Sequence, residues 1–244
     1  MHVFYGESLF IAVAFWAYLN ALQQKWWRVG VLLAVLTATR LPSLLFVALC
    51  ALEYLRAYEW NIKKAANKNI LWFLLAPIGF IAYGLYLTIV RGDFFAMFHA
   101  YSTTDDWAYQ IFNPNIFATL SETVLKIGSS LATRQFNYEI FVNYALPLAA
   151  ITAIAGSSLY LLLKLKSEGV PLFVFGIFAI ILFTLNSNVI SVHRYALACI
   201  VLYIAVGLIN KTGNLRILLS GGILCSLSIQ VFLYSRFIQT VFAG

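Results

Sequence analysis

The sequence predicts an all-α protein, a polytopic bundle of transmembrane helices, and three observations support this fold class. Hydrophobic residues fill 62% of the 244 positions, charged residues fill only 10%, and the mean hydropathy is +0.87. Apolar windows close to the roughly 20 residues that cross a bilayer recur along the chain. Lysine and arginine gather between these windows. This composition excludes an ordinary soluble domain.

About six windows are long enough to be full spans, and a further apolar stretch is interrupted. No segment repeats and none is low-complexity, so we expect one membrane domain over 1–244, with about six full spans and a short helical hairpin. The expected spans are 4–22, 69–90, 140–163, 170–187, 195–209 and 217–235.

The interrupted stretch is 29–55, with Thr39-Arg40-Leu41-Pro42 near its middle. An arginine at the centre of a span costs roughly 2.5 to 3.5 kcal/mol on insertion scales, and proline also removes a backbone donor. One interpretation is a single span kinked at Pro42, with Arg40 facing a polar cavity at mid-membrane. The other is two short helices whose connecting tip carries Arg40 to the far surface. Both make Arg40 a candidate site.

The distribution of basic residues favours the hairpin. Cytoplasmic loops carry an excess of lysine and arginine. If the basic clusters are all cytoplasmic, 29–55 must enter and leave on one side as two helices of roughly 11 to 14 residues. The net charge of +7 then reflects topology rather than a nucleic-acid partner. The clusters are Lys25 and Arg28; Arg56, Lys63, Lys64 and Lys68; Lys164 and Lys166; and Lys211 and Arg216.

Under this topology the segment 91–139 is an extracytoplasmic loop. It carries more acids than bases and many aromatic side chains, which favour a membrane interface over a disordered tail. Within it, residues 115–131 place apolar side chains among polar ones at helical spacing. We expect an amphipathic helix that lies at the membrane surface.

Three polar clusters fall on the expected outer face: Tyr5 to Ser8, Asp93 to Trp107, and Asn186 to Arg194. The ordinary interpretation of Glu7 is a helix N-terminus. The ordinary interpretation of Asp105 and Asp106 is a solvated cap. The alternative is a ligand site, because arginine forks bind phosphate and aromatic rings stack on sugars. A divalent cation at the paired aspartates stays open, so the cofactor is unknown, and the cysteine spacing gives no metal centre. Candidate binding residues for a lipid phosphate or its substrate are Arg40, His99, Trp107, His193 and Arg194.

Four segments in order resemble the PIG-V-type mannosyltransferases and their bacterial relatives. Phe4-Tyr5-Gly6-Glu7-Ser8-Leu9-Phe10 is similar to their Tyr-Ser/Thr-Glu-Ser-Leu-Phe segment, and Thr37 to Leu45 to the Thr-Arg motif that follows. Gly92 to Ala100 with Trp107 and Pro114 resembles their Gly-Asp-x-x-Ala-Phe-x-x-Ala-Gln segment, although Tyr101 stands where Gln is common. His193-Arg194-Tyr195 resembles their late Arg-Tyr segment.

The resemblance implies a glycosyltransferase of the GT-C superfamily in a bacterial plasma membrane or the endoplasmic reticulum. Such an enzyme transfers a sugar, here mannose, from a polyprenyl-phosphate donor on the extracytoplasmic side. In related enzymes a basic residue at the tip of a short hairpin faces the lipid phosphate. The resemblance implies that Arg40 corresponds to this residue. A carboxylate acts as general base. The candidates within this chain are Glu7, Asp93, Asp105 and Asp106.

The usual catalytic loop of the family, a Trp-Asp motif after its first span, has no counterpart here. We therefore expect the C-terminal part of such an enzyme: a truncated gene, a divergent member, or a chain that is inactive without a subunit that supplies the N-terminal region. The alternative is a non-catalytic polytopic membrane protein, either a partner subunit or a transporter-like binding module. The expected partners are the polyprenyl-phosphate-linked sugar and membrane lipid, and no nucleic acid.

Overall fold

The chain is all-helical in the part that the structure describes. This computed structural model describes residues 7–39, 42–96, 99, 115–185, 189–190, 192–209 and scattered positions between 221 and 235. Every regular element among them is a helix, with no strand, which confirms the all-α class. Contacts divide the chain into two compact units, which we describe separately. Unit 1 is Met1–Ile111 with Lys166–Ala179, and unit 2 is Phe112–Leu165 with Ile180–Gly244.

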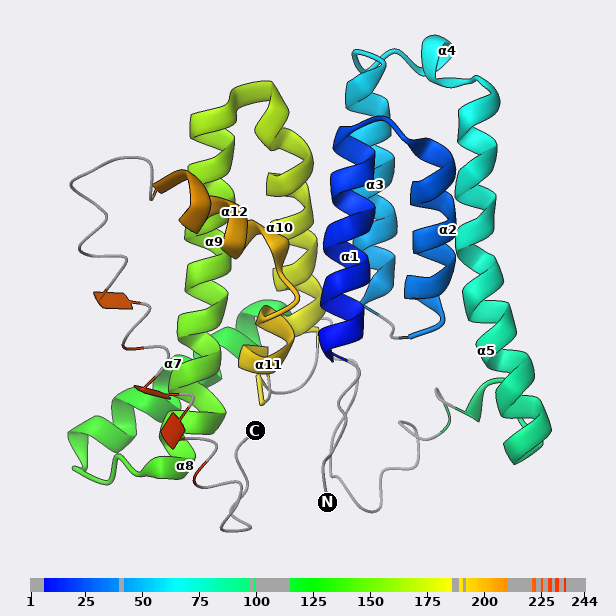
Figure 1. Ribbon diagram of the computed structural model, residues 1–244. Coiled ribbons are helices and arrows are strands. Elements are labelled where there is room, and N and C mark those ends of the chain that lie inside the picture. Colours follow the sequence, from blue (N-terminus) through cyan, green and yellow to red (C-terminus); the bar gives the residue numbers. More distant parts are fainter. Residues whose placement is uncertain are drawn as a thin grey trace. The chain divides into compact units, whose positions relative to one another are not determined.

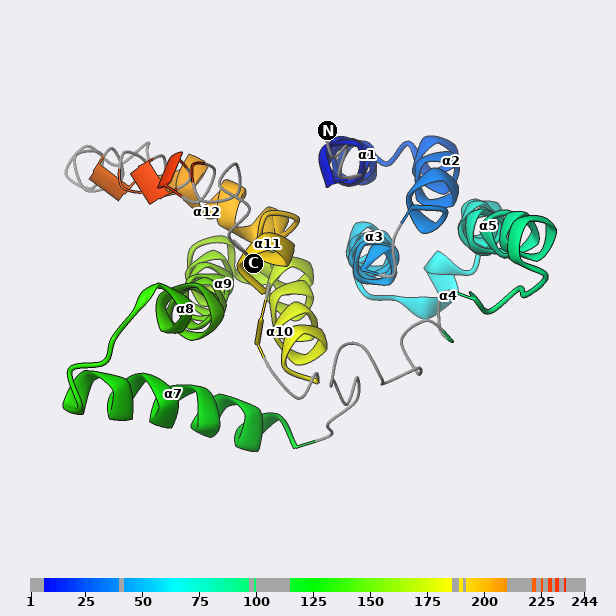
Figure 2. The ribbon, with the colours of Figure 1, turned by 90° about the horizontal axis from the view of Figure 1, so that it is seen from below.

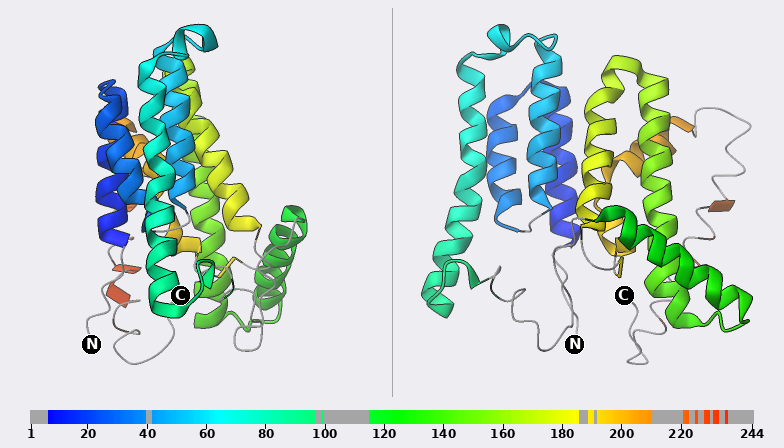
Figure 3. Two further views of the ribbon diagram at one scale, coloured as in Figure 1. Left: turned by 90° about the vertical axis from the view of Figure 1, so that its right-hand side faces the viewer. Right: turned by 180° about the vertical axis from the view of Figure 1, so that it is seen from behind.

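Unit 1 is a set of helices that run alternately up and down (Figure 1). Since successive helices reverse direction, α1 begins, α3 begins and α5 ends at one end of the unit, where the connection between α2 and α3 also lies (Figures 1 and 3). We call this the tip end. The elements are α1 (Glu7–Leu22), α2 (Trp26–Thr37), α3 (Ser43–Ala57), α4 (Ile62–Ala65), the 3₁₀-helix η1 (Lys68–Leu75) and α5 (Ala76–Arg91).

The interrupted apolar stretch forms two helices, as the hairpin interpretation predicts. α2 has 12 residues and α3 has 15, and the two lie side by side with 38–42 between them (Figure 1). Pro42 is the N-cap of α3, a position that needs no backbone N–H. The single kinked span is therefore not the arrangement in this structure.

Helix α2 approaches η1 and α5 so closely that two positions must be glycine. A Cβ on Gly79 would lie 1.7 Å from the Ala34 carbonyl oxygen, and one on Gly30 would lie 2.3 Å from that of Trp72. The Thr37 hydroxyl donates to the Ala76 carbonyl across the same contact, at 2.5 Å. Small residues that let backbones approach are typical of helix packing in membranes.

The end of unit 1 opposite the tip end is held by packed aromatic rings. Trp26 packs edge-on to Tyr54 with ring centroids 4.8 Å apart, and Tyr54 contacts Phe73 at 5.4 Å. The Tyr54 hydroxyl donates to the Ala65 carbonyl at 2.6 Å, which ties α3 to α4. The first residues of α10 (Val170–Thr184) belong to this unit as well, and Phe175 lies against Phe46 with ring centroids 5.0 Å apart.

Unit 2 contains one helix that lies crosswise to another. Figure 2 shows α9 end-on and α7 along its length, and the helix predicted over 115–131 is confirmed as α7. Before Pro147 the helix widens into a π-helical turn, since proline cannot donate to the carbonyl four residues earlier. The elements are α7 (Ile116–Ala132), α8 (Tyr138–Ile140), the π-helix η2 (Phe141–Ala145), α9 (Leu146–Leu165), α11 (Val192–Ala196) and α12 (Ile200–Ile209). The 3₁₀-helix η3 (Lys166–Gly169) and α10 (Val170–Thr184) complete the chain, and the unit boundary falls within α10.

One expected span is broken where the sequence gives no signal. The window 195–209 contains a turn between α11 and α12. At this turn the Leu197 carbonyl lies beyond the end of α11. The Tyr203 hydroxyl donates a hydrogen bond to it at 2.9 Å. The expected span 217–235 lies mostly outside the described residues.

Two helical stretches in the described part of the chain are long and apolar enough to cross a membrane. They are Lys68–Arg91 and Tyr138–Thr184, by length and composition. Helices α1, α2 and α12 are apolar but shorter, so the expected number of six full spans stays a prediction.

Candidate functional site

The tip end of unit 1 contains a carboxylate–imidazole pair. Asp93 Oδ2 lies 2.7 Å from His99 Nδ1, and Asp93 Oδ1 accepts the Phe95 N–H at 2.9 Å. The hydrogen bond from His99 is the largest effect and lowers the pKa of the Asp93 carboxyl; desolvation opposes it, and the Phe95 N–H lowers the pKa further. Both side chains reach solvent, with 37% of Asp93 and 67% of His99 exposed.

The last turns of α5 position this pair. Gly92 ends the helix in the left-handed conformation, with φ +72°, and its N–H donates to the Thr88 carbonyl at 2.9 Å. Phe94 then folds back over Gly84, where a Cβ would lie 2.3 Å from the Phe94 ring. The chain therefore leaves α5 along a fixed path, and Asp93 lies directly after the helix end.

Three of the sequence-predicted regions lie at the tip end of unit 1. Glu7 is the first residue of α1, and Thr39 and Pro42 flank the position of Arg40. Arg40 itself, Asp105, Asp106, Trp107 and the side chain of Glu7 lie outside the described residues. Their roles stay predictions.

The late predicted residues belong to unit 2. His193 is half-buried in α11, and Arg194 follows it in the same helix, with its side chain outside the described part. The structure thus places Asp93 and His99 in contact and assigns His193 and Arg194 to the other unit.

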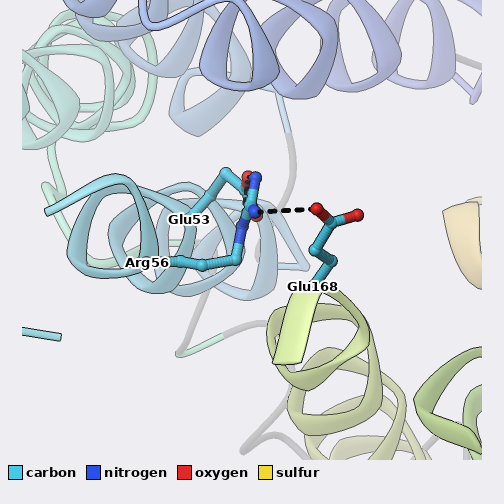
Figure 4. Close-up of polar contacts among 3 residues, drawn as sticks. All are labelled: Glu53, Arg56 and Glu168. Carbon is cyan, nitrogen blue, oxygen red and sulfur yellow. Dashed lines mark hydrogen bonds and ion pairs between the residues drawn. The ribbon is translucent and has the colours of Figure 1, made fainter. Parts of the chain in front are cut away.

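A second polar cluster, at the opposite end of unit 1, was missed by the sequence reasoning. Glu53 on α3 is 1% exposed, and Arg56 Nε donates to its Oε1 at 2.8 Å while Nη2 donates to the same oxygen. Glu168 of η3 lies on the other side of the guanidinium, at 4.0 Å from Nη1 (Figure 4). The other Glu53 oxygen has no hydrogen-bond partner in the described structure.

The signal for this cluster was present in the sequence. Glu53 is an acid inside an apolar run, three residues before a base, and that spacing puts both on one helix face. Arg56 was expected among the basic residues of the following loop, so its pairing with Glu53 was not predicted. Because a buried carboxylate needs a hydrogen-bond partner, the Arg56 side chain lies along α3 against Glu53 and does not extend fully into solvent.

In the described part of the chain, the charged side chains discussed above form pairs. No group of three His, Cys, Asp or Glu residues is close enough to hold a metal ion there. The chemistry that the Asp93–His99 pair supports is proton transfer, because the hydrogen bond from the imidazole holds the carboxylate in place as a proton acceptor.

Comparison of the chain with protein-family models, with curated proteins and with solved structures gave no match.

Proposed function

We propose that the chain is a multi-pass integral membrane protein and a glycosyltransferase, or a part of one, that uses a polyprenyl-phosphate sugar. The proposal of membrane insertion is supported by the outer face of η1 and α5. Ile89 is 85% exposed and Leu74 is 66% exposed, which is costly in water and ordinary against lipid. Other large exposed apolar side chains there are Leu71, Ile78, Ile81, Leu85, Tyr86 and Val90.

The observation that carries the transferase proposal is the meeting of two features at the tip end. The end of α2 and the start of α3, which flank Arg40 in the sequence, lie at the same end of unit 1 as the end of α5, which the Asp93–His99 pair follows. A phosphate ligand needs a cation, and an acceptor hydroxyl needs a base. We assign both tasks to this end of unit 1.

The proposed reaction assigns one task to each group. The Asp93 carboxylate, held by His99, accepts the proton of the acceptor hydroxyl as its oxygen forms a bond to the anomeric carbon of the sugar. The bond from that carbon to the phosphate oxygen breaks, and the lipid phosphate leaves with its electron pair. Arg40 neutralises the charge that develops on this phosphate. Mannose is the sugar that the family resemblance implies.

Donor binding is the first experiment. The purified chain in lipid nanodiscs is incubated with radiolabelled polyprenyl-phosphate mannose, and bound label is measured for the wild type, for Arg40→Gln and for the control Arg28→Gln. Arg28 lies on α2 near the end opposite the tip, over the Trp27 ring at 5.3 Å. Loss of a charge-assisted phosphate contact should weaken binding about 10- to 100-fold in Arg40→Gln only.

Transfer is the second experiment, with added membrane lipid extract as acceptor. Label should move to a new product with the wild-type chain, and Asp93→Asn should abolish transfer while donor binding stays. Equal binding of polyprenyl-phosphate mannose and polyprenol, or equal affinities of the two arginine variants, would contradict the phosphate assignment. Binding without transfer would favour a non-catalytic binding module instead.

A further inference from the structure

Helix α7 buries hydroxyl side chains and exposes large apolar ones. Thr119 and Thr123 are 2% and 3% exposed, whereas Phe117 is 83% exposed. The buried hydroxyls are satisfied within the helix, as Thr123 shows by donating to the Thr119 carbonyl at 2.8 Å. A surface helix in water has the reverse arrangement, because apolar side chains turn toward the core.

The outward face is a continuous stripe along the helix. Phe117, Val124 and Leu131 follow one another at intervals of seven residues, which is about two helical turns. Val124 is 53% exposed and Leu131 58% exposed, so the stripe continues to the last turn. The helix also lies crosswise to α9 (Figure 2), and α9 belongs to a stretch long and apolar enough to span a membrane. This is the relation of an interfacial helix to a spanning one.

A polar hollow opens at the C-terminal end of α7. Its volume is about 720 Å³, and its lining consists of basic, hydroxyl and amide side chains with two apolar ones. No carboxylate is among them. The lining residues are Lys126, Ser129, Ser130, Thr133, Arg134, Gln135, Phe136, Asn137 and Ile140.

The two bases of the hollow have no acidic partner in the described part of unit 2. Lys126 Nζ donates to the Tyr144 hydroxyl at 2.9 Å and lies 4.8 Å from the centre of that ring. None of the ion pairs between described residues includes Lys126 or Arg134. Their charge is available to an anion, and the hydroxyls around them can donate to it.

Arg134 is held in a backbone conformation that favours glycine. Its φ is +55°, and it closes α7 with the Gln135 N–H donating to the Ser130 carbonyl at 2.8 Å. Arginine at this position is strained relative to glycine. A cation is thus placed at the rim of the hollow at a cost in backbone energy.

From these features we infer that α7 lies in the membrane interface and that the hollow binds the phosphate of an anionic phospholipid. The stripe of Phe117, Val124 and Leu131 lies among the acyl chains, and Lys126 and Arg134 contact the headgroup. A membrane lipid is the occupant because the apolar stripe reaches the helix end that carries the hollow. This site lies in unit 2 and is independent of the proposed sugar transfer.

Lipid retention tests the headgroup contact. The purified full chain is incubated with phosphatidylglycerol or phosphatidylcholine, and bound lipid is counted by native mass spectrometry. The variant Lys126→Gln with Arg134→Gly removes both charges, keeps a donor toward Tyr144 and relieves the backbone strain. Each base near a membrane contributes a factor of about five, so phosphatidylglycerol affinity should fall roughly 25-fold.

The matched control is Lys63→Gln with Lys166→Gly. It also removes two bases, and Lys166 is likewise at positive φ, +54°. Phosphatidylglycerol retention by this control should stay near the wild-type value. If both double variants lost phosphatidylglycerol retention equally, the effect would come from net charge alone, and the proposed site would be wrong. If millimolar inorganic phosphate displaced bound lipid and the chain showed no preference for phosphatidylglycerol over phosphatidylcholine, the hollow would be a site for free phosphate. The proposal of a phospholipid would then be wrong.

Helix depth is a second, independent measurement. A spin label at Val124→Cys or at Ser129→Cys, in a cysteine-free background in liposomes, reports collisions with oxygen and with a water-soluble nickel chelate. Val124 should favour oxygen, and Ser129, which lines the hollow, should favour the chelate. Equal access of the chelate to both positions would place α7 in water and contradict the inference.

Discussion

At the scale of single residues, the buried carboxylate of Glu53 is the most demanding group in unit 1. It is the one charged residue among the buried positions that the structure describes. Arg56 supplies both of its hydrogen bonds, and 25% of the Arg56 side chain is exposed. The pair therefore reaches solvent only through Arg56, and its stability depends on keeping both partners.

We expect Arg56→Ala to destabilise the protein by about 2 to 3 kcal/mol. Breaking a fully buried pair costs roughly 3 to 5 kcal/mol, and the partial exposure of Arg56 reduces that figure. Glu53→Gln in the same chain should restore much of the loss, because an amide is cheaper to bury than a carboxylate. Denaturant-induced unfolding in detergent micelles measures both. Lys64→Ala is the control, since it breaks an exposed pair with Glu59 and should have a smaller effect.

The Asp93–His99 pair gives a pH prediction. The pKa of Asp93 is lowered first by the His99 hydrogen bond, so His99→Ala should raise it toward the ordinary value of 3.8. With a lowered pKa in the folded state, the carboxylate contributes stability above its ordinary pKa, and this is lost as the pH falls through the lowered value.

Selective ¹³C labelling of aspartate followed by NMR titration would measure this change. The chain has three aspartates, Asp93, Asp105 and Asp106, so Asp93→Asn identifies the signal directly. A titration curve that is the same in His99→Ala and the wild type would show that the hydrogen bond does not set the pKa.

At the scale of elements, the fold of unit 1 depends on how closely α2 and α5 approach. The contact has no room for a methyl group at Gly79, whereas Gly156 on α9 has nothing within 4 Å. Both glycines lie within helices, but a larger side chain would fit only at Gly156. Close backbone contact, not helix propensity, decides the outcome at the first of them.

We expect Gly79→Ala to destabilise unit 1 by roughly 2 to 3 kcal/mol, because the new Cβ forces two backbones apart. Gly156→Ala should leave stability unchanged or raise it by up to about 1 kcal/mol, since alanine is the better helix former. Unfolding in a series of sodium dodecyl sulfate fractions compares the two. Similar losses in both would contradict the close crossing.

At the scale of the whole molecule, the alternating direction of α1, α2, α3 and α5 sorts the connections of unit 1 into two ends. The segments 23–25 and 58–67 lie opposite the tip end (Figure 1). The basic residues Lys25, Lys63 and Lys64 belong to these segments, whereas 38–42 and Gly92 lie at the tip end. This is the separation that the positive-inside bias requires of the proposed topology.

Substituted-cysteine labelling tests this separation in intact cells. Cysteine at Thr39 should react with a membrane-impermeant maleimide, and cysteine at Gln24 or Lys63 should react only after the cells are opened. The native cysteines are first replaced, since Cys225 is exposed. A single kinked span would place Gln24 and Lys63 on opposite sides, so reaction of only one of these two in intact cells would contradict the hairpin.

The sequence predicted the helices best where local chemistry decides them. Thr39-Arg40-Leu41-Pro42 marks the break between α2 and α3, and the spacing of apolar side chains marks α7. It missed the turn between α11 and α12, which has no glycine or proline and is stabilised by the Tyr203 hydroxyl. Of the candidate site, Asp93 and His99 were predicted individually, and their contact follows from the path set by Gly92 and Phe94.

The sequence by itself determined the helical class, because long apolar segments can satisfy their backbone hydrogen bonds only within a helix or a closed sheet, and helical spacing and breaks favour the helix. It also determined the order of the helices and the hairpin. The tertiary structure alone decided which side chains meet: Glu168 reaches Arg56 across more than a hundred residues, and α7 turns its hydroxyls inward. Burial and pairing depend on which faces pack together, and that is a property of the whole unit rather than of any window of sequence.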